Sequence, residues 1–108
     1  MQSSVRWTVI DQDGNSIYLT QERWEHIIES INHPEMAEYE EELKSTIRFG
    51  KRAQDPINPQ KYRYSMPFDG LVAYNTHIVA IILYRFREQE SKFVPNNYIV
   101  TAYQKEIG

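Results

Sequence analysis

The sequence predicts one α+β domain in which two N-terminal helices pack on a roughly four-stranded antiparallel sheet. Three observations support this fold class. A chain of 108 residues has the length of one domain, so residues 1–108 are expected to form a single unit. Apolar residues recur with a helical period before residue 50 and alternate with polar residues after residue 60. Aromatic residues make up 13% of the chain and suit the half-buried surface of a sheet.

The chain begins with a segment that is predicted to be extended. Residues 5–10 alternate loosely between apolar and polar types, and residues 11–15 have the composition of a turn. Apolar residues return at 17–19. This pattern leaves two interpretations open, a short N-terminal hairpin or an extended lead-in to the first helix.

The first helix is predicted from Thr20 to about Asn32. Thr20 is a favoured N-cap residue, and Glu22 suits the positive end of the helix dipole. Pro34 disfavours helical geometry at His33, so the helix is expected to end there. The stripe expected to face the core has helical spacing and consists of Trp24, Ile27, Ile28 and Ile31.

A second helix is predicted from Pro34 to about Phe49. Proline is favoured at the first position of a helix, and Gly50 stands where a left-handed C-cap residue belongs. The inner stripe is expected to be Met36, Tyr39, Leu43 and Ile47, and a solvated face is expected at Glu38, Glu40, Glu41 and Glu42.

The sheet is predicted in the second half of the chain. Residues 51–60 include two prolines and are expected to be a connection with at most one short strand. Strands are expected at residues 61–66, 71–75, 77–86 and 98–103, with a polar loop at 87–97. In the first of these strands the alternation places Tyr62 and Tyr64 on one face and Arg63 on the other.

Composition and charge exclude several classes of function. The chain has no cysteine, which excludes disulfides, thiol nucleophiles, iron–sulfur clusters and cysteine-based zinc sites and fits a reducing cytoplasm. The longest apolar run, residues 78–84, is far shorter than a membrane span, so no membrane association is expected. The net charge of −3 divides into −7 for residues 1–44 and +4 for residues 45–108. Nucleic-acid binding by the whole surface is therefore disfavoured, whereas a local phosphate site in the second half remains open.

The three histidines are candidates for proton transfer. His26 points roughly 150° away from the apolar stripe of its helix, as either an ordinary exposed histidine or an acid–base group would. His33 lies seven residues later, where it could cap the second helix, and His77 has no identifiable partner. His26 and His33 lack the spacing and the third ligand of a zinc site, so no metal and no other cofactor is predicted.

Arg63 and the last strand supply the candidate anion site. A guanidinium on the face opposite the tyrosines could hold a phosphate with two hydrogen bonds, or it could form a salt bridge or stay solvated. In the last strand Tyr98, Val100 and Ala102 are expected on the helix side, and Ile99, Thr101 and Tyr103 on the other. Thr101 and Tyr103 could donate hydrogen bonds to phosphate beside Arg63, although β propensity alone also explains them.

Four short motifs are similar to those of a nuclease family. They are Trp24-Glu25-His26-Ile27, His33-Pro34-Glu35, Tyr62-Arg63-Tyr64 and Ile99-Val100-Thr101-Ala102-Tyr103. Together they resemble the phage-type barnase/EndoU/colicin/RelE-like nucleases from about Leu19 to Tyr103. The resemblance implies helices packed on a four-stranded antiparallel sheet and metal-independent cleavage of RNA, in which the ribose 2′-hydroxyl attacks the adjacent phosphate.

The resemblance also implies roles for single residues. His26, Arg63 and Thr101 would be catalytic, with His26 transferring protons, Arg63 stabilising the phosphate and Thr101 positioning it. Tyr103, Tyr64 and His33 would contact the substrate. The implied protein is a cytoplasmic endoribonuclease, as a toxin or phage-derived effector, and its partners would be RNA and a protein inhibitor or antitoxin. A homo-oligomer stays open, and so does a non-catalytic protein- or RNA-binding regulatory module on the same fold.

Overall fold

The structure is a computed structural model that describes residues 4–107, and sheet dominates it, with 44% strand and 21% helix. Its strands are β1 (Val5–Ile10), β2 (Ser16–Thr20), β3 (Lys51–Gln54), β4 (Lys61–Pro67), β5 (His77–Leu83), β6 (Phe86–Gln89), β7 (Lys92–Pro95) and β8 (Asn97–Lys105). The helices are α1 (Gln21–Ile27), the 3₁₀ helix η1 (Pro34–Glu38) and α2 (Glu40–Phe49).

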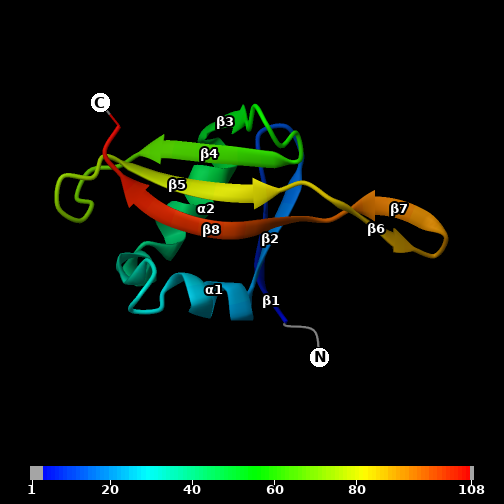
Figure 1. Cartoon of the computed structure of the whole chain (residues 1–108), viewed down its shortest axis with the longest axis horizontal. Helices are drawn as coiled ribbons and strands as arrows, with labels where there is room; N and C mark the ends of the chain where they lie inside the picture. The colour runs from blue at the N-terminus through cyan, green and yellow to red at the C-terminus, as the bar shows by residue number, and fades with distance from the viewer. Residues whose placement is uncertain (1–3, 108) are drawn as a thin grey trace.

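Six strands form one mixed sheet in the order β1-β2-β8-β5-β4-β3. Neighbouring strands are antiparallel except β2 and β8, which run parallel where Ile17 opposes Asn97 and Tyr18 opposes Tyr98. Strands β6 and β7 pair only with each other, and they extend beyond the end of the main sheet (Figure 1). The predicted fold class, two helices on a four-stranded antiparallel sheet, is therefore wrong.

The prediction failed because strand pairing depends on partners that are distant in the sequence. The turn-rich residues 11–15 do join two strands, so the N-terminal hairpin exists. Its second strand then pairs with β8 about 80 residues later, and β3 adds a sixth strand at the opposite edge. Nothing in the local pattern of either short segment indicates which strand it will join.

The first helix is shorter than predicted because its C-terminus is capped early. α1 begins as expected, with the Thr20 hydroxyl accepting the amide of Arg23 at 3.1 Å. It ends at Ile27, where the Asn32 side chain donates to the His26 carbonyl at 2.9 Å. Ile31 therefore leaves the predicted core stripe and is 85% exposed.

The second predicted helix divides into two pieces. η1 covers Pro34–Glu38, and α2 begins only after Tyr39, whose φ of −122° and ψ of 27° interrupt the helix. The three glutamates that open α2 suit the positive end of its dipole, and Arg48 suits the other end. The ring of Trp7 and the guanidinium of Arg6 both hydrogen-bond Glu40, which ties β1 to this helix start.

Two further segments differ from the sequence prediction. Residues 71–75 form bends and turns rather than a strand. Residues 87–97, predicted as a polar loop, contain most of the β6–β7 hairpin, whose turn residues Glu90 and Ser91 both have positive φ. The sequence does not reveal this hairpin, because nearly all of its side chains are exposed. A strand with no buried face lacks the alternation of apolar and polar residues by which strands are recognised.

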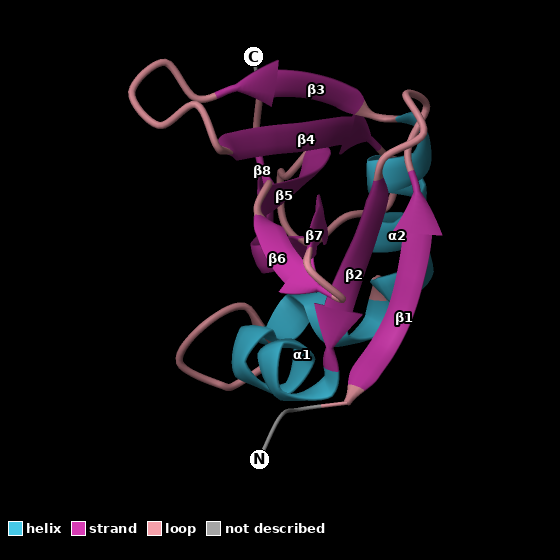
Figure 2. Cartoon of the chain, turned by 90° about the vertical axis from the view of Figure 1, so that its right-hand side faces the viewer, coloured by secondary structure: helices cyan, strands magenta, loops and turns pink. Residues whose placement is uncertain are grey.

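The main sheet has two different faces. The helix face carries the core residues Tyr64, Ile78, Ala80, Ile82 and Ala102, and α2 crosses behind it in Figure 1. The open face carries Arg63, Ser65, Ile81, Thr101 and Tyr103. Figure 2 shows β1 and β2 standing beside α2 and helping to enclose this core. No helix within residues 4–107 has the length and apolarity that crossing a membrane requires.

A β-bulge corrects the predicted faces of the last strand. Ile81 pairs with Thr101 and Ile82 pairs with Ile99, so Val100 is an extra residue on β8. Because of this extra residue, the side chains before Val100 point to the opposite faces from those that uninterrupted alternation predicts. Ile99 is consequently buried on the helix face, whereas Tyr98 joins Thr101 and Tyr103 on the open face, contrary to the prediction for both.

Candidate functional site

The open face brings Arg63 and Thr101 into one row. Arg63 on β4 pairs with Ile81 on β5, and Ile81 pairs with Thr101 on β8. Their backbones are therefore about 10 Å apart, which is two strand spacings. Tyr103 lies in the next row, where Val79 separates it from Ser65. A group resting over Ile81 would have a guanidinium on one side and a hydroxyl on the other.

Arg63 borders a hollow of about 510 Å³ on this face, called here the Arg63 hollow. The Nε of Arg63 is buried and has no hydrogen-bond partner among residues 4–107. A buried donor without an acceptor costs about 1–3 kcal/mol, so this arginine is held in place at some cost in stability. The hollow is lined by Lys51, Ala53, Arg63, Ser65, His77, Lys105, Glu106 and Ile107.

Tyr103 and His33 form an aromatic pair next to this row. Their ring centroids are 5.5 Å apart and the rings are tilted by 34°. His33 lies at the N-cap of η1, yet its side chain makes no capping hydrogen bond; its Nδ1 lies 3.6 Å from the Glu35 carboxylate. The capping role considered for His33 is thus absent, and its ring contributes a flat surface beside the strand.

His26 lies in a different hollow from Arg63. Its hollow, of about 630 Å³, lies between α1 and β8 and is lined by Tyr18, Thr20, Glu22, Arg23, His26, Glu29, Tyr98 and Ile99. The His26 side chain is 57% exposed, and its Nδ1 lies 3.7 Å from Glu29. α1 runs along β8 beyond the point where β2 has separated from it (Figure 1). Thr101 therefore lies on the strand between the two hollows and lines neither of them.

Tyr64 is on the opposite face from Arg63. It is 1% exposed, and its hydroxyl donates to Asp11 Oδ2 at 2.5 Å and also contacts the hydroxyl of Tyr84. The alternation pattern had already placed the two neighbours on opposite faces. A substrate on the open face does not reach this ring, so the substrate-contacting role that the resemblance implied for Tyr64 has no geometric support.

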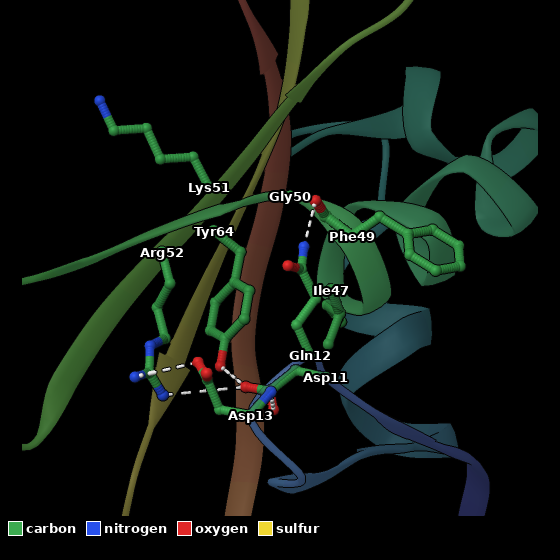
Figure 3. Close-up of a pocket in the computed structure, with 9 residues that line it drawn as sticks. All are labelled: Asp11, Gln12, Asp13, Ile47, Phe49, Gly50, Lys51, Arg52 and Tyr64. Atoms are coloured by element: carbon green, nitrogen blue, oxygen red, sulfur yellow. Dashed lines mark hydrogen bonds and ion pairs between the residues drawn. The ribbon is translucent and has the colours of Figure 1, made fainter.

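Tyr64 belongs instead to a polar network that the sequence did not reveal, called here the Asp11 latch (Figure 3). Arg52 Nη1 donates to the Tyr84 hydroxyl at 3.1 Å and lies 3.8 Å from Asp11 Oδ2, and Arg52 Nη2 lies 3.2 Å from Asp13. The guanidinium also lies near the rings of Tyr62 and Tyr84, with centroid distances of 5.1 and 5.9 Å. Figure 3 shows Lys51 pointing away from this network, as strand alternation requires.

The Asp11 latch joins the two edges of the sheet. Asp11 and Asp13 belong to the β1–β2 turn, whereas Arg52 belongs to β3 at the other edge. Asp11 Oδ1 also accepts the amides of Asp13 and Asn15, which fixes the turn itself. Gln12 donates from this turn to the Phe49 carbonyl at 2.6 Å. Aspartate in a turn was recognisable, but its partner 41 residues away had no local signal.

The latch changes the pKa values of its members. Burial raises the pKa of Asp11, but hydrogen bonds from Tyr64 and Asn15 outweigh burial and hold that pKa below its usual value. Burial raises the pKa of Tyr64, and its bond to Asp11 raises it further. The hydrogen bond to Tyr84 raises the pKa of Arg52. The centre of the network therefore consists of the Asp11 carboxylate, the Arg52 cation and two neutral tyrosines, and Asp13 contacts Arg52 at its outer side.

Within residues 4–107, no three His, Asp or Glu side chains gather closely enough to hold a metal ion. The chain matches no protein family, no curated protein and no solved structure. Because these comparisons supply no function, the functional proposal is based on the geometry of the open face and of the two hollows beside it.

Proposed function

We propose that the protein is a small metal-independent endoribonuclease that acts in the cytoplasm on its open sheet face. The ribose 2′-hydroxyl would attack the adjacent phosphorus, forming the O2′–P bond and breaking the P–O5′ bond. The products are a 2′,3′-cyclic phosphate and a 5′-hydroxyl. The attacking hydroxyl loses a proton and the leaving oxygen gains one, so the reaction needs proton transfer and a cation.

The observation that carries this proposal is the row of Arg63, Ile81 and Thr101. A phosphate over Ile81 would accept hydrogen bonds from the Arg63 guanidinium and from the Thr101 hydroxyl. Arg63 also lines the neighbouring hollow, so its side chain borders the space that a phosphate on this face would occupy. Tyr103 and His33 would offer a stacking surface for a neighbouring base.

His26 is the proposed proton-transfer group, and its placement sets a condition on the substrate. For this role the 2′-hydroxyl or the leaving oxygen of the reacting nucleotide would have to come within hydrogen-bond reach of the His26 ring while its phosphate lies close to Thr101, so RNA would have to cross β8 from the His26 hollow toward Arg63. A short single strand lying along this path would touch both hollows. Such a protein would act as a toxin or phage-derived effector, controlled by a protein inhibitor or antitoxin.

A second candidate is a non-catalytic RNA-binding or protein-binding regulatory module. The separation of His26 and Arg63 into two hollows favours it, because binding along a face does not require that they meet at one atom. The positively charged Arg63 hollow would still attract an RNA backbone.

RNA cleavage in the presence of EDTA tests the first candidate. We expect the unaltered protein to produce 2′,3′-cyclic phosphate ends. Arg63→Ala removes a donor that stabilises the phosphate, so its cleavage rate should be lower by about 100-fold or more. His26→Ala should lower the cleavage rate by a similar factor. Arg48→Ala is the matched control, since Arg48 is an exposed arginine in the last turn of α2.

The outcomes separate the two candidates. Equal cleavage by all four proteins would contradict both proposed catalytic roles and indicate a contaminating nuclease. Binding of RNA without cleavage, weakened by Arg63→Ala and unchanged by His26→Ala, would reject the enzyme and support the binding module.

A further inference from the structure

We propose that the Arg63 hollow binds a phosphate monoester, with His77 as one of its direct ligands. The inference deepens the proposed function, because it names RNA with a terminal phosphate as the substrate class of the same face. It concerns the end of the open face that is farther from His26. The sequence had identified no partner for His77, so this residue gains a role only from its placement.

The register gathers the basic groups of this hollow from four strands. His77 on β5 and Lys105 on β8 form a directly opposed pair, so their side chains are immediate neighbours. Lys51 on β3 opposes Ser65 on β4, one row closer to His77 than the row of Ala53 and Arg63. These residues are far apart in the sequence, and only the sheet brings them together.

The orientation of the His77 ring is fixed from one side. Its Nδ1 lies 2.7 Å from the Thr76 hydroxyl, which accepts the amide of Ile107 at 3.0 Å. The Thr76 amide in turn donates to the Lys105 carbonyl at 3.0 Å. Nε2, the other ring nitrogen, has no hydrogen-bond partner within residues 4–107. When the Thr76 hydroxyl donates to Nδ1, the proton of the neutral ring is on Nε2, which can then donate to an oxygen of a bound phosphate.

The charge balance favours a dianion over a phosphodiester. Lys51, Arg63 and Lys105 contribute three positive charges to the lining, and Glu106 contributes one negative charge. The net charge of the fixed groups matches the two negative charges that a phosphate monoester carries near neutral pH. A phosphodiester in the middle of a chain carries only one. The hollow therefore complements the phosphorylated end of a nucleic acid chain, or a free phosphate, better than its interior.

Histidine signals in a ¹H–¹³C NMR titration test the site, because the chain has three histidines and two of them serve as internal controls. Inorganic phosphate is the first probe, and sodium chloride of equal ionic strength is the blank. We expect the ring signals of His77 to move with phosphate while those of His26 do not. Arg63→Ala should weaken the apparent affinity at least about tenfold, which is 1.4 kcal/mol.

A control variant and a second probe complete the design. Lys61→Ala removes a positive charge from the same strand and face as Arg63, outside the hollow, and should leave phosphate binding unchanged. A short RNA with a 5′-monophosphate should move the His77 signals at lower concentration than the same RNA with a 5′-hydroxyl. Equal effects of the two RNAs, with inorganic phosphate still bound, would assign the hollow to free phosphate and overturn the RNA-end assignment.

The test does not depend on catalysis. Movement of His77 signals in a protein that cleaves no RNA would support this site and contradict the nuclease. Two results would overturn the phosphate site: His77 signals that do not respond to phosphate, or signals of all three histidines that move equally with sodium chloride. If the same protein cleaves RNA, the proposed nuclease activity would still hold.

Discussion

Asp11 is a carboxylate whose side chain is only 2% exposed, and hydrogen bonds keep it ionised. Loss of water raises its pKa, but donors from Tyr64 and Asn15 lower it by more. Because the pKa in the folded state lies below the unfolded-state value of 3.8, the ionised form stabilises the fold. That contribution is complete at neutral pH and is lost as the pH falls through the folded-state pKa.

Asp11→Asn should therefore destabilise the protein at pH 7 by about 1–3 kcal/mol, because the amide leaves the buried tyrosine hydroxyl poorly paired. Urea unfolding at pH 7 and at pH 3 measures the effect. The difference between the variant and the unaltered protein should be smaller at pH 3, because below the unfolded-state pKa of 3.8 the unfolded chain binds a proton at Asp11 and part of the stabilisation is lost.

Asp13→Asn is the matched control for this prediction. It alters an aspartate of the same turn that contacts the same arginine, but its side chain is 62% exposed. We expect a change below about 1 kcal/mol at either pH, as is usual for exposed ion pairs. An effect as large as that of Asp11→Asn would show that the turn, rather than the buried carboxylate, sets stability.

The sequence was sufficient to predict the positions of some single residues but not the contacts of others. The alternation of Tyr62, Arg63 and Tyr64 was sufficient to place Arg63 opposite the tyrosines, because strand geometry is local. The pairing of Arg52 with Asp11 and the contact of His77 with Thr76 and Lys105 were not predicted. The first depends on how two sheet edges meet, and the second on the register of β5 against β8.

At the scale of the element, Gly50 connects α2 to β3 at a point where other backbone segments lie very close to it. Its φ is −73° and its ψ is 167°, so it is extended, and the left-handed cap predicted from the sequence is wrong. A Cβ at this position would collide with the Thr46 carbonyl and lie 2.7 Å from the Ser65 carbonyl. Glycine is needed here because two backbone segments leave no room for a side chain.

Gly50→Ala should lower the free energy of unfolding by about 1–3 kcal/mol, as overpacking against backbone does. Gly50→Asn distinguishes this cause from a left-handed cap, where asparagine is tolerated. We expect Asn to be at least as harmful as Ala. Lys51→Ala, at the next and exposed residue, should stay within about 0.5 kcal/mol. Urea unfolding measures all three, and a well-tolerated Asn would contradict the steric explanation.

The limits of prediction for the elements have identifiable causes. The start of α1 could be predicted from Thr20 because capping is local. Its end could not, because an asparagine five residues beyond the helix supplies the cap. The faces of β8 were predicted correctly for Thr101, Tyr103 and Ala102 but not for Tyr98 and Ile99. A β-bulge cannot be recognised from the alternation of apolar and polar residues in a strand where apolar residues occur on both faces.

At the scale of the whole molecule, stability is expected to be uneven. β5 is flanked by β4 and β8 and has four buried residues, whereas β6 and β7 are a separate two-stranded sheet with nearly all side chains exposed. Isolated hairpins are marginally stable in water. Amides in β6 and β7 should therefore exchange with deuterium at least about 100-fold faster than those in β5.

Hydrogen exchange at two protein concentrations provides the measurement and its control. Fast exchange in β6 and β7 at both concentrations is the expected result. Protection equal to that of β5 would contradict the prediction. Protection that rises with concentration would show that the exposed Phe86 and Phe93 are covered by a second copy of the chain.

The overall topology was beyond prediction because the sheet is built from distant segments. The local signals gave strands and helices in roughly the right places, but six strands can be ordered in many ways. The parallel pair of β2 and β8 involves only two residues on each strand, and it decides whether the N-terminal hairpin belongs to the sheet.

The position of β8 also has a consequence during synthesis. Of the eight strands, β8 leaves the ribosome last, yet it occupies the interior of the sheet between β2 and β5. Until it emerges, the N-terminal hairpin has no partner strand, and one edge of β5 is unpaired. Between the synthesis of β5 and that of β8, the nascent chain therefore exposes two unpaired strand edges, one on β2 and one on β5, which makes chaperone contact and late completion of the sheet expected properties.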